Sequence, residues 1–199
     1  MSWRLDWTER ELGGIPVLIA QPKGEQPSGA VLWYHSWAND KEKSRPQLKR
    51  LAKAGLLAIG VDAVAHGGRP LPQRFLTAES PGTAKEAYFF RLVAETAAEV
   101  PLIVDALMSE GLAERVAIGG ISMGGEMAYG AFAREPRLCA MATVLGCPVW
   151  PRPDSPHLVL EEAAPPRPIL ALTATHDTTC PPRATLRLYE KLAPHYRHA

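Results

Sequence analysis

The sequence predicts an α/β fold in which a mostly parallel β-sheet carries helices on both faces. Short, continuous apolar runs bounded by turn residues recur along the 199 residues, a pattern typical of strands that are buried on both faces. Segments with helical spacing lie between these runs, and strand–helix alternation favours parallel strands joined by crossover helices. The length suits one well-buried domain, so we expect residues 1–199 to form a single domain without a separate cap domain.

The expected strands follow one another at regular intervals. We predict strands at residues 15–20, 30–34, 56–61, 115–119, 139–145 and 169–173. The first residues, 3–20, are more typical of an antiparallel hairpin at one edge of the sheet.

The helices are expected between these strands. Residues 43–55 end at Gly55, a good residue for leaving a helix. Residues 84–111 form a long helical stretch that we expect to bend or restart at Pro101. Further helices are predicted at 126–136 and 182–194. The connections 67–82 and 148–168 are interpreted as loops that act as short lids, which suggests an open site and small substrates.

Charge and cysteine content narrow the function classes. With 22 Lys and Arg against 21 Asp and Glu, the net charge is +1, so neither nucleic acid nor an anionic membrane is an expected partner. No apolar stretch approaches the roughly 18 residues of a membrane span. The odd number of cysteines (Cys139, Cys147, Cys180) and the charged start indicate free thiols in the cytoplasm. No cluster has the spacing of metal ligands, and we expect no cofactor.

The segment GGISMGGEMAYG at residues 119–130 contains the pattern G-x-S-x-G around Ser122. An apolar run precedes it and a helical run follows it, which is the context that a nucleophile on a sharp strand-to-helix turn requires. The alternative is a tight structural turn. A dinucleotide fingerprint is disfavoured, because the glycine spacing is wrong and the motif lies late in the chain.

Together with this turn, three further segments in the same order make the chain resemble an α/β-hydrolase, closest to the dienelactone-hydrolase-like and prolyl-oligopeptidase-like esterases. These segments are LWYHSW (32–37), VDAVAHGGR (61–69) and ILALTATHD (169–177). The resemblance implies that the backbone N–H groups of Met123 and Trp37 form an oxyanion hole. Ser36 stands where relatives usually have glycine. His35 and His66 are expected to hold their loops by hydrogen bonds.

The resemblance also implies an acid after the strand at 169–173. Asp177 fits by position, and Asp154 in the preceding loop is the second candidate. The alternative for Asp177 is a turn or helix-capping aspartate. Cys180, three residues further on, is expected to be an inert free thiol.

The general base has more than one candidate. The expected order Ser, Asp, His leaves His195 and His198, and few residues remain for the further strand that relatives place before their histidine. Three interpretations stay open. The chain is C-terminally incomplete, so that the last strand and the true histidine lie beyond Ala199; or His195 or His198 folds back over Ser122; or there is no triad base. Among the residues present, His195 is the one that we assign.

The predicted function is a serine hydrolase, carboxylesterase-like, that cleaves small esters through an acyl-enzyme on Ser122. A peptidase or thioesterase of the same fold is the alternative within the class, and a catalytically inactive binding domain is the alternative outside it. Without a further strand, 169–174 would be an exposed apolar edge, which favours a homodimer or aggregation. An apolar substrate pocket is predicted from six side chains: Trp37, Phe75, Tyr88, Phe89, Met123 and Trp150.

Overall fold

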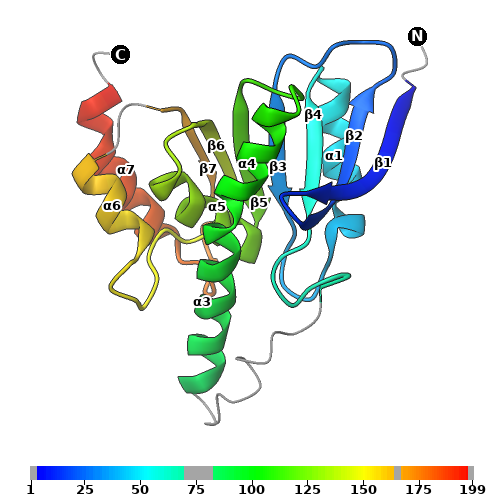
Figure 1. The fold of residues 1–199 in the computed structure, drawn as a ribbon. Coiled ribbons are helices and arrows are strands. Elements are labelled where there is room, and N and C mark those ends of the chain that lie inside the picture. Colours follow the sequence, from blue (N-terminus) through cyan, green and yellow to red (C-terminus); the bar gives the residue numbers. More distant parts are fainter. Residues whose placement is uncertain (1–3, 70–82, 164–166, 197–199) are drawn as a thin grey trace.

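The computed structural model describes residues 4–69, 83–163 and 167–196, and its centre is one seven-stranded sheet (Figure 1). The strands are β1 (Leu5–Leu12), β2 (Ile15–Pro22), β3 (Ala30–Tyr34), β4 (Leu57–Val61), β5 (Val116–Ile121), β6 (Leu138–Val144) and β7 (Ile169–Leu172). Their spatial order is β1-β2-β4-β3-β5-β6-β7. β1 and β2 pair antiparallel, as do β2 and β4, and the remaining neighbours are parallel. The predicted hairpin and parallel sheet are confirmed.

The register of the sheet aligns the carboxyl ends of three strands. Ile121 of β5 pairs with Val144 of β6, and Val144 pairs with Leu172 of β7. The loops that follow these three strands therefore leave the sheet at the same edge. Ligand sites of open α/β sheets form at this edge.

All helices except α6, which was not predicted, begin and end within a few residues of the predicted positions. They are α1 (Arg45–Lys53, preceded by a 3₁₀ turn at Lys41–Ser44), α3 (Thr83–Ala98), α4 (Val100–Ser109), α5 (Met123–Arg134), α6 (Pro156–Ala163) and α7 (Pro182–Tyr196). The long helical stretch restarts at Val100, with Pro101 in the first turn of α4, where its missing N–H has no partner to lose. Gly55, two residues after the end of α1, has a φ of +85°.

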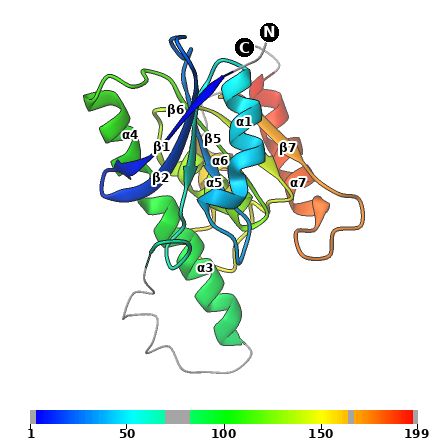
Figure 2. The same ribbon diagram turned by 90° about the vertical axis from the view of Figure 1, so that its right-hand side faces the viewer.

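Two hydrophobic cores cover the two faces of the sheet. The larger core combines strand side chains with residues of α3, α4 and α5, among them Tyr129 and Phe132, which are almost fully buried. The smaller core packs Leu48 and Ala52 of α1 against Leu18 of β2. Seen from the β1 edge, α1 and α4 lie on opposite sides of the sheet (Figure 2). Helices on both faces are thus confirmed.

The expected lids and the expected sheet edge have different outcomes. The segment 148–168, expected to be a loop, contains the helix α6 (Pro156–Ala163), which begins at a proline. Most of the other expected lid, 67–82, lies outside the described residues. Among the described residues, β7 is the outermost strand on its side of the sheet, and 56% of Leu170 and 52% of Leu172 are exposed, as expected for such an edge. None of the helices within the described ranges combines the length and the hydropathy needed to cross a membrane.

Candidate functional site

Ser122 lies at the sharp turn between β5 and α5. Its backbone has a φ of +53° and a ψ of −119°, a conformation that residues with a Cβ rarely adopt. Two backbone hydrogen bonds hold it there: its N–H donates to Val144 O of β6 at 2.8 Å, and its carbonyl accepts from the Glu126 N–H at 3.1 Å. The side chain is half-buried at the carboxyl edge of the sheet. This geometry matches the strained serine turn that the motif predicts.

The glycines of the motif are required by close backbone contacts. A Cβ on Gly120 would clash with the backbone of Gly124, and a Cβ on Gly124 would clash with the carbonyl of Tyr34 at the end of β3. Gly125 likewise approaches Gly146, the second residue after β6. The three glycines therefore let the first turn of α5 pack directly against the ends of its neighbouring strands.

The loop after β3 runs beside the first turn of α5. His35 is buried; its Nε2 accepts from the Ala63 N–H at 3.2 Å and its Nδ1 lies 2.9 Å from Ser36 O. Burial lowers the pKa of His35, which favours the neutral ring that this arrangement needs. Ser36 Oγ accepts from Asn39 Nδ2 at 2.6 Å, within a turn that includes Trp37. His35 and Ser36 thus hold the loop that carries Trp37.

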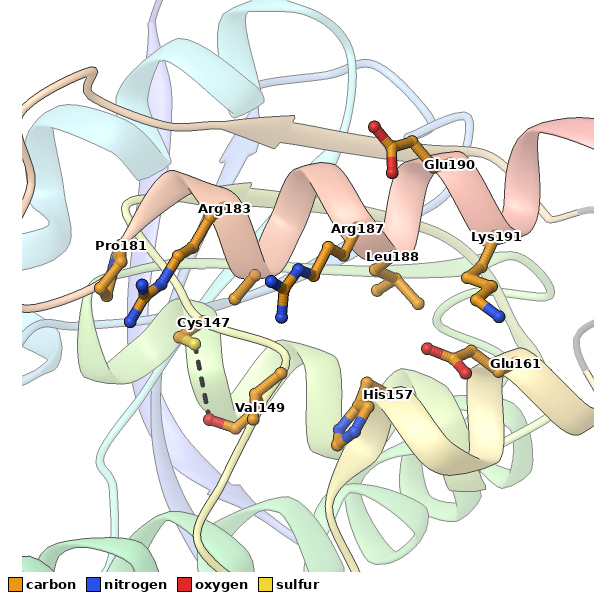
Figure 3. A pocket seen from close by; sticks show the side chains of 11 residues that line it. Cys147, Val149, His157, Glu161, Pro181, Arg183, Arg187, Leu188, Glu190 and Lys191 are labelled. Carbon is orange, nitrogen blue, oxygen red and sulfur yellow. Dashed lines mark hydrogen bonds between the residues drawn. The ribbon is translucent and has the colours of Figure 1, made fainter.

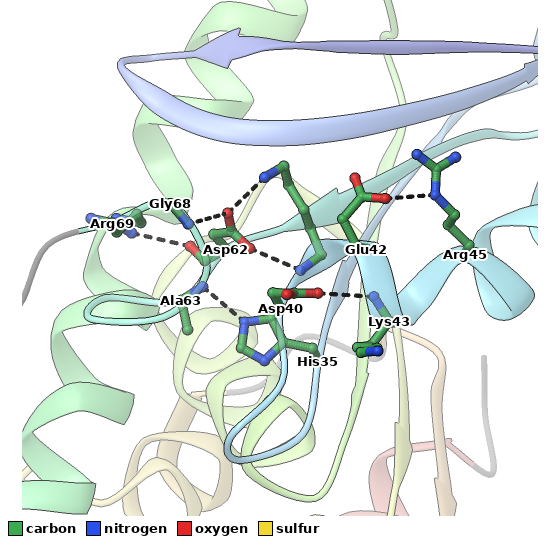
Figure 4. A network of polar contacts seen from close by, with 10 residues as sticks. His35, Asp40, Glu42, Lys43, Arg45, Asp62, Ala63, Gly68 and Arg69 are labelled. Carbon is green, nitrogen blue, oxygen red and sulfur yellow. Dashed lines mark hydrogen bonds and ion pairs between the residues drawn. The ribbon is translucent and has the colours of Figure 1, made fainter.

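The turn after β4 is fixed by a buried aspartate (Figure 4). Asp62 is fully buried and accepts from the backbone N–H and the Nζ of Lys41, at 2.8 and 2.9 Å. Arg69 donates to Asp62 O and makes two 2.7 Å bonds to Glu99. His66 closes the turn through Nδ1, 2.9 Å from Val64 O. Its ring also makes an edge contact with Trp37, with centroids 5.3 Å apart.

Asp177 lies in the loop between β7 and α7, at the same edge of the sheet as Ser122. Its Oδ1 accepts from the N–H groups of Thr179 (2.9 Å) and Cys180 (2.8 Å). These two bonds make Asp177 a turn aspartate, as the alternative interpretation expects. They also orient the carboxylate and leave Oδ2 without a hydrogen bond from the described residues. A histidine imidazole could therefore be held at Oδ2.

His195 lies far from Asp177 and Ser122. It is exposed near the end of α7, and the rise from Pro182 to His195 is about 20 Å at 1.5 Å per residue. The neighbouring Tyr196 donates its hydroxyl to Arg167 O at 2.5 Å, just before β7 begins. His195 is therefore at the opposite edge of the sheet from Ser122, because α7 runs back along β7, and this placement does not support it as the base.

The end of the chain, including His198 and Ala199, lies outside the described residues. The assignment of the base to His198 and the interpretation that the true base lies beyond Ala199 both stay predictions. The position of His195 does not support His195 as the base. The interpretations that remain are His198 as the base, a base beyond Ala199, and no triad base.

The remaining described histidines do not complete a triad either. Within residues 4–69, 83–163 and 167–196, no histidine hydrogen-bonds to Ser122 or Asp177. His157 lies 2.8 Å, through Nδ1, from Ser155 Oγ. Asp154, the second candidate for the acid, is paired with Arg152 at 2.7 Å, which lowers the pKa of its carboxyl. Asp154 thus has a structural partner of its own.

The predicted pocket side chains are divided between core and surface. Trp150 (3% exposed) and Met123 (1% exposed) belong to the larger core, where Trp150 covers Gly130. Trp37, by contrast, is 46% exposed and contacts Phe89 at a centroid distance of 5.4 Å. Trp37 and Phe89 are therefore available to contact a substrate, whereas Trp150 and Met123 act through packing. Phe75 lies outside the described residues.

A groove of about 900 Å³ opens between α6 and α7 (Figure 3). Arg183, Arg187 and Lys191 of α7 line one side of it, and His157 of α6 lines the other. One end is formed by Cys147 and Pro181, which adjoin Gly146 and Cys180. Gly146, which precedes Cys147, lies against Gly125 in the first turn of α5. Within the three described ranges, no group of three or more His, Cys, Asp and Glu side chains is arranged to hold a metal ion.

Sequence reasoning missed Glu126, which lies one helical turn after Ser122. It is 4% exposed, and its Oε1 accepts from Cys180 Sγ at 3.5 Å. Burial raises its pKa to about 8. The available signal was a lone charged residue in the otherwise apolar and small run EMAYGAFA.

Comparison with known proteins agrees with this geometry. The model of the dienelactone hydrolase family matches residues 15–198. The esterase YjfP of Escherichia coli K12 is 31% identical over 141 residues, which are 69% of this chain and 53% of that protein. The chain thus spans about half the length of this curated relative.

Solved structures share the fold. TT1662 from Thermus thermophilus superposes with a TM-score of 0.78 at 20% identity, covering 98% of this chain and 86% of that one. A cold-adapted esterase from an Arctic intertidal metagenomic library superposes with a TM-score of 0.66 at 18% identity, covering 96% and 85%. These likenesses establish the α/β-hydrolase fold, and the family match covers nearly the whole chain. The chain therefore belongs to the dienelactone hydrolase family.

Proposed function

We propose that this chain is a serine hydrolase that cleaves small carboxylic esters through an acyl-enzyme. The observation that carries the proposal is the backbone of Ser122, held at a φ of +53° between β5 and α5. Strain of this kind persists only where the surrounding structure enforces it, and it is common at active sites. Membership of the dienelactone hydrolase family supports the same reaction class.

In the proposed reaction, Ser122 Oγ adds to the ester carbonyl while a histidine takes its proton. The N–H groups of Met123 and Trp37 bind the oxyanion. Met123 is the first residue of α5, so its N–H has no partner within the helix and the positive end of the helix points toward the site. The oxyanion then collapses, the histidine protonates the leaving alcohol, and water hydrolyses the acyl-enzyme by the same route.

Asp177 is proposed as the acid that orients this histidine. Its Oδ1 is fixed by two backbone N–H groups, which leaves Oδ2 to accept from the imidazole. Replacing Asp177 by Asn is expected to lower turnover by roughly 10⁴-fold, the effect of losing the orienting acid in other serine hydrolases. Unchanged turnover would remove Asp177 from the triad.

The serine itself is tested with a fluorophosphonate probe and a p-nitrophenyl acetate assay. We expect one probe molecule per chain, and loss of both labelling and turnover in Ser122→Ala. Ser155→Ala is the control, because it removes the hydroxyl of a serine outside the turn at Ser122, one that accepts from the Trp150 N–H just before α6. Absence of labelling in folded wild-type protein would refute the proposal.

The base is identified by replacing His157, His176, His195 and His198 by Ala one at a time. Loss of turnover in one variant names the base. Turnover retained in all four variants means that none of them serves in this role. The interpretation that the base lies beyond Ala199 is checked in the coding sequence: an apolar strand followed by a Gly-His loop after Ala199 supports it, and an immediate stop codon counts against it.

Location and assembly are also proposals. Three free thiols, at Cys139, Cys147 and Cys180, support a cytoplasmic location, which fractionation of cells that express the chain checks. The exposed leucines of β7 support a homodimer, and light scattering after gel filtration measures its mass. A monomer at micromolar concentration contradicts the second proposal.

A further inference from the structure

The carboxyl group of Glu126 is buried directly behind the nucleophile. Its backbone N–H donates to Ser122 O, so the two residues share the first turn of α5. Only 4% of the residue is exposed. Oε1 accepts from Cys180 Sγ, while Oε2 is buried without a hydrogen-bond partner among the described residues. A carboxylate that is buried with a single thiol donor is poorly compensated, which favours the neutral acid.

The groups that face Glu126 provide no positive charge. Cys180 approaches from the loop before α7 and Cys147 approaches from the loop after β6, and both thiols also interact with Asp177. Among the described residues, no lysine, arginine or histidine forms an ion pair with Glu126. Burial raises the pKa of Glu126 to about 8 and raises the pKa values of both thiols. At neutral pH the cluster therefore contains neutral Glu126 and neutral thiols beside Asp177.

Cys180 links Glu126 to the proposed acid. Its backbone N–H donates to Asp177 Oδ1 at 2.8 Å, and its thiol donates to Glu126 Oε1 at 3.5 Å. Cys180 is 5% exposed, so this contact lies inside the protein. The turn that orients Asp177 is thus attached to the helix that carries Ser122 through one residue and two hydrogen bonds.

We propose that Glu126 is a positioning residue of the ester-cleavage site, which as a neutral acid holds the Cys180 turn against the nucleophile helix and which lowers activity when it ionises. This inference rests on the proposed function. An ionised Glu126 would place a second negative charge behind Ser122, where the oxyanion develops. At an effective dielectric constant of about 20, a unit charge about two helical turns (~11 Å) from the oxyanion reduces the rate on the order of tenfold.

The test is the pH dependence of two rates between pH 6 and 9.5: kcat/KM for p-nitrophenyl acetate and the second-order rate of fluorophosphonate labelling. In the wild type, both rates are expected to fall about tenfold through a midpoint near pH 8. In Glu126→Gln, which keeps the size and the neutrality of the side chain, this fall is expected to disappear. Glu135→Gln is the matched control, because Glu135 is equally buried but pairs with Arg137 at the other end of α5.

Each outcome decides a different point. A fall near pH 8 that is shared by wild type and Glu126→Gln, or absent from the wild type, overturns the inference while the hydrolase stands. If no variant is labelled at Ser122 at any pH, the proposed function fails, and the role of Glu126 in it fails too.

A second measurement keeps the inference testable if Glu126→Gln does not fold. In wild-type protein labelled with ¹³C at the glutamate carboxyl carbons, one resonance is expected to titrate near pH 8. Titration of all glutamates below pH 6 overturns the inference.

Discussion

The buried carboxyl of Glu126 makes a quantitative prediction about stability, independent of any activity. In the unfolded chain this carboxyl titrates near its ordinary value of 4.5, whereas burial raises its pKa to about 8 in the folded protein. The folded state therefore binds the proton more tightly. Its contribution to stability is fully present below pH 4.5 and is lost as the pH rises toward 8. Glu126→Gln, which does not titrate, should become more stable relative to the wild type over this interval.

The magnitude follows from the width of the interval. One pH unit corresponds to ~1.4 kcal/mol, so a displacement from 4.5 to about 8 sets an upper limit of roughly 5 kcal/mol. Relaxation and water entry reduce such penalties, and we expect the difference between Glu126→Gln and the wild type to grow by ~2–4 kcal/mol from pH 5 to pH 8.5. Urea unfolding, followed by circular dichroism at each pH, measures this difference.

Glu135, the residue that follows α5, gives a control in which the pKa shift has the opposite sign. Its carboxylate accepts three hydrogen bonds from Arg137, which lower its pKa. Its contribution to stability is present above the ordinary pKa and is lost as the pH falls through the lowered value. Glu135→Gln should therefore be most destabilising at neutral pH. If the difference between Glu126→Gln and the wild type does not change with pH, the reasoning about Glu126 is refuted.

Three further predictions concern the framework of the site. Gly124→Ala should destabilise the protein by ~1–3 kcal/mol or more and abolish turnover, because the new Cβ would clash with Tyr34 O. Urea unfolding measures the stability and the ester assay measures the turnover. Wild-type stability and turnover in this variant would contradict the packing argument. Lys41→Met should lower the free energy of unfolding by ~3–5 kcal/mol, because it leaves the fully buried Asp62 without its charge partner. Adding Asp62→Asn should recover part of the lost stability. Equal stability of the single and the double variant would contradict this prediction. Burial raises the pKa of the Cys180 thiol, so iodoacetamide at pH 7.5 should leave Cys180 unmodified in the native protein and modify it in urea. Mass spectrometry of peptides measures the modification. Rapid modification of Cys180 in the native protein would refute the prediction.

Most strands and the serine turn could be predicted because their signals are local. The run at 30–34 coincides with β3, and the runs before Val61 and after Ile169 begin or end within one or two residues of their strands. Apolar runs between turn residues need no knowledge of partners to be recognised. The glycines around Ser122 are similarly informative, because the serine turn requires several glycines within one short segment of sequence.

The remaining features depend on contacts between distant segments. Helix α6 was missed because its prolines favour a loop, although Pro156 begins the helix instead of breaking it. Trp150 was expected to line the pocket, but its place in the core depends on contact with Gly130. His195 follows the acid in the expected order, yet α7 carries it to the opposite edge of the sheet. Sequence order alone does not include the direction in which a helix runs.

The strained backbone of Ser122 also sets a limit on how this protein can be improved. A φ of +53° suits glycine better than serine, so Ser122→Gly should raise the melting temperature slightly while removing the proposed nucleophile. A laboratory selection for heat resistance alone would thus favour loss of the residue that we propose as the nucleophile. Directed evolution of this fold has to screen for activity and stability together, because at this one position the two requirements oppose each other.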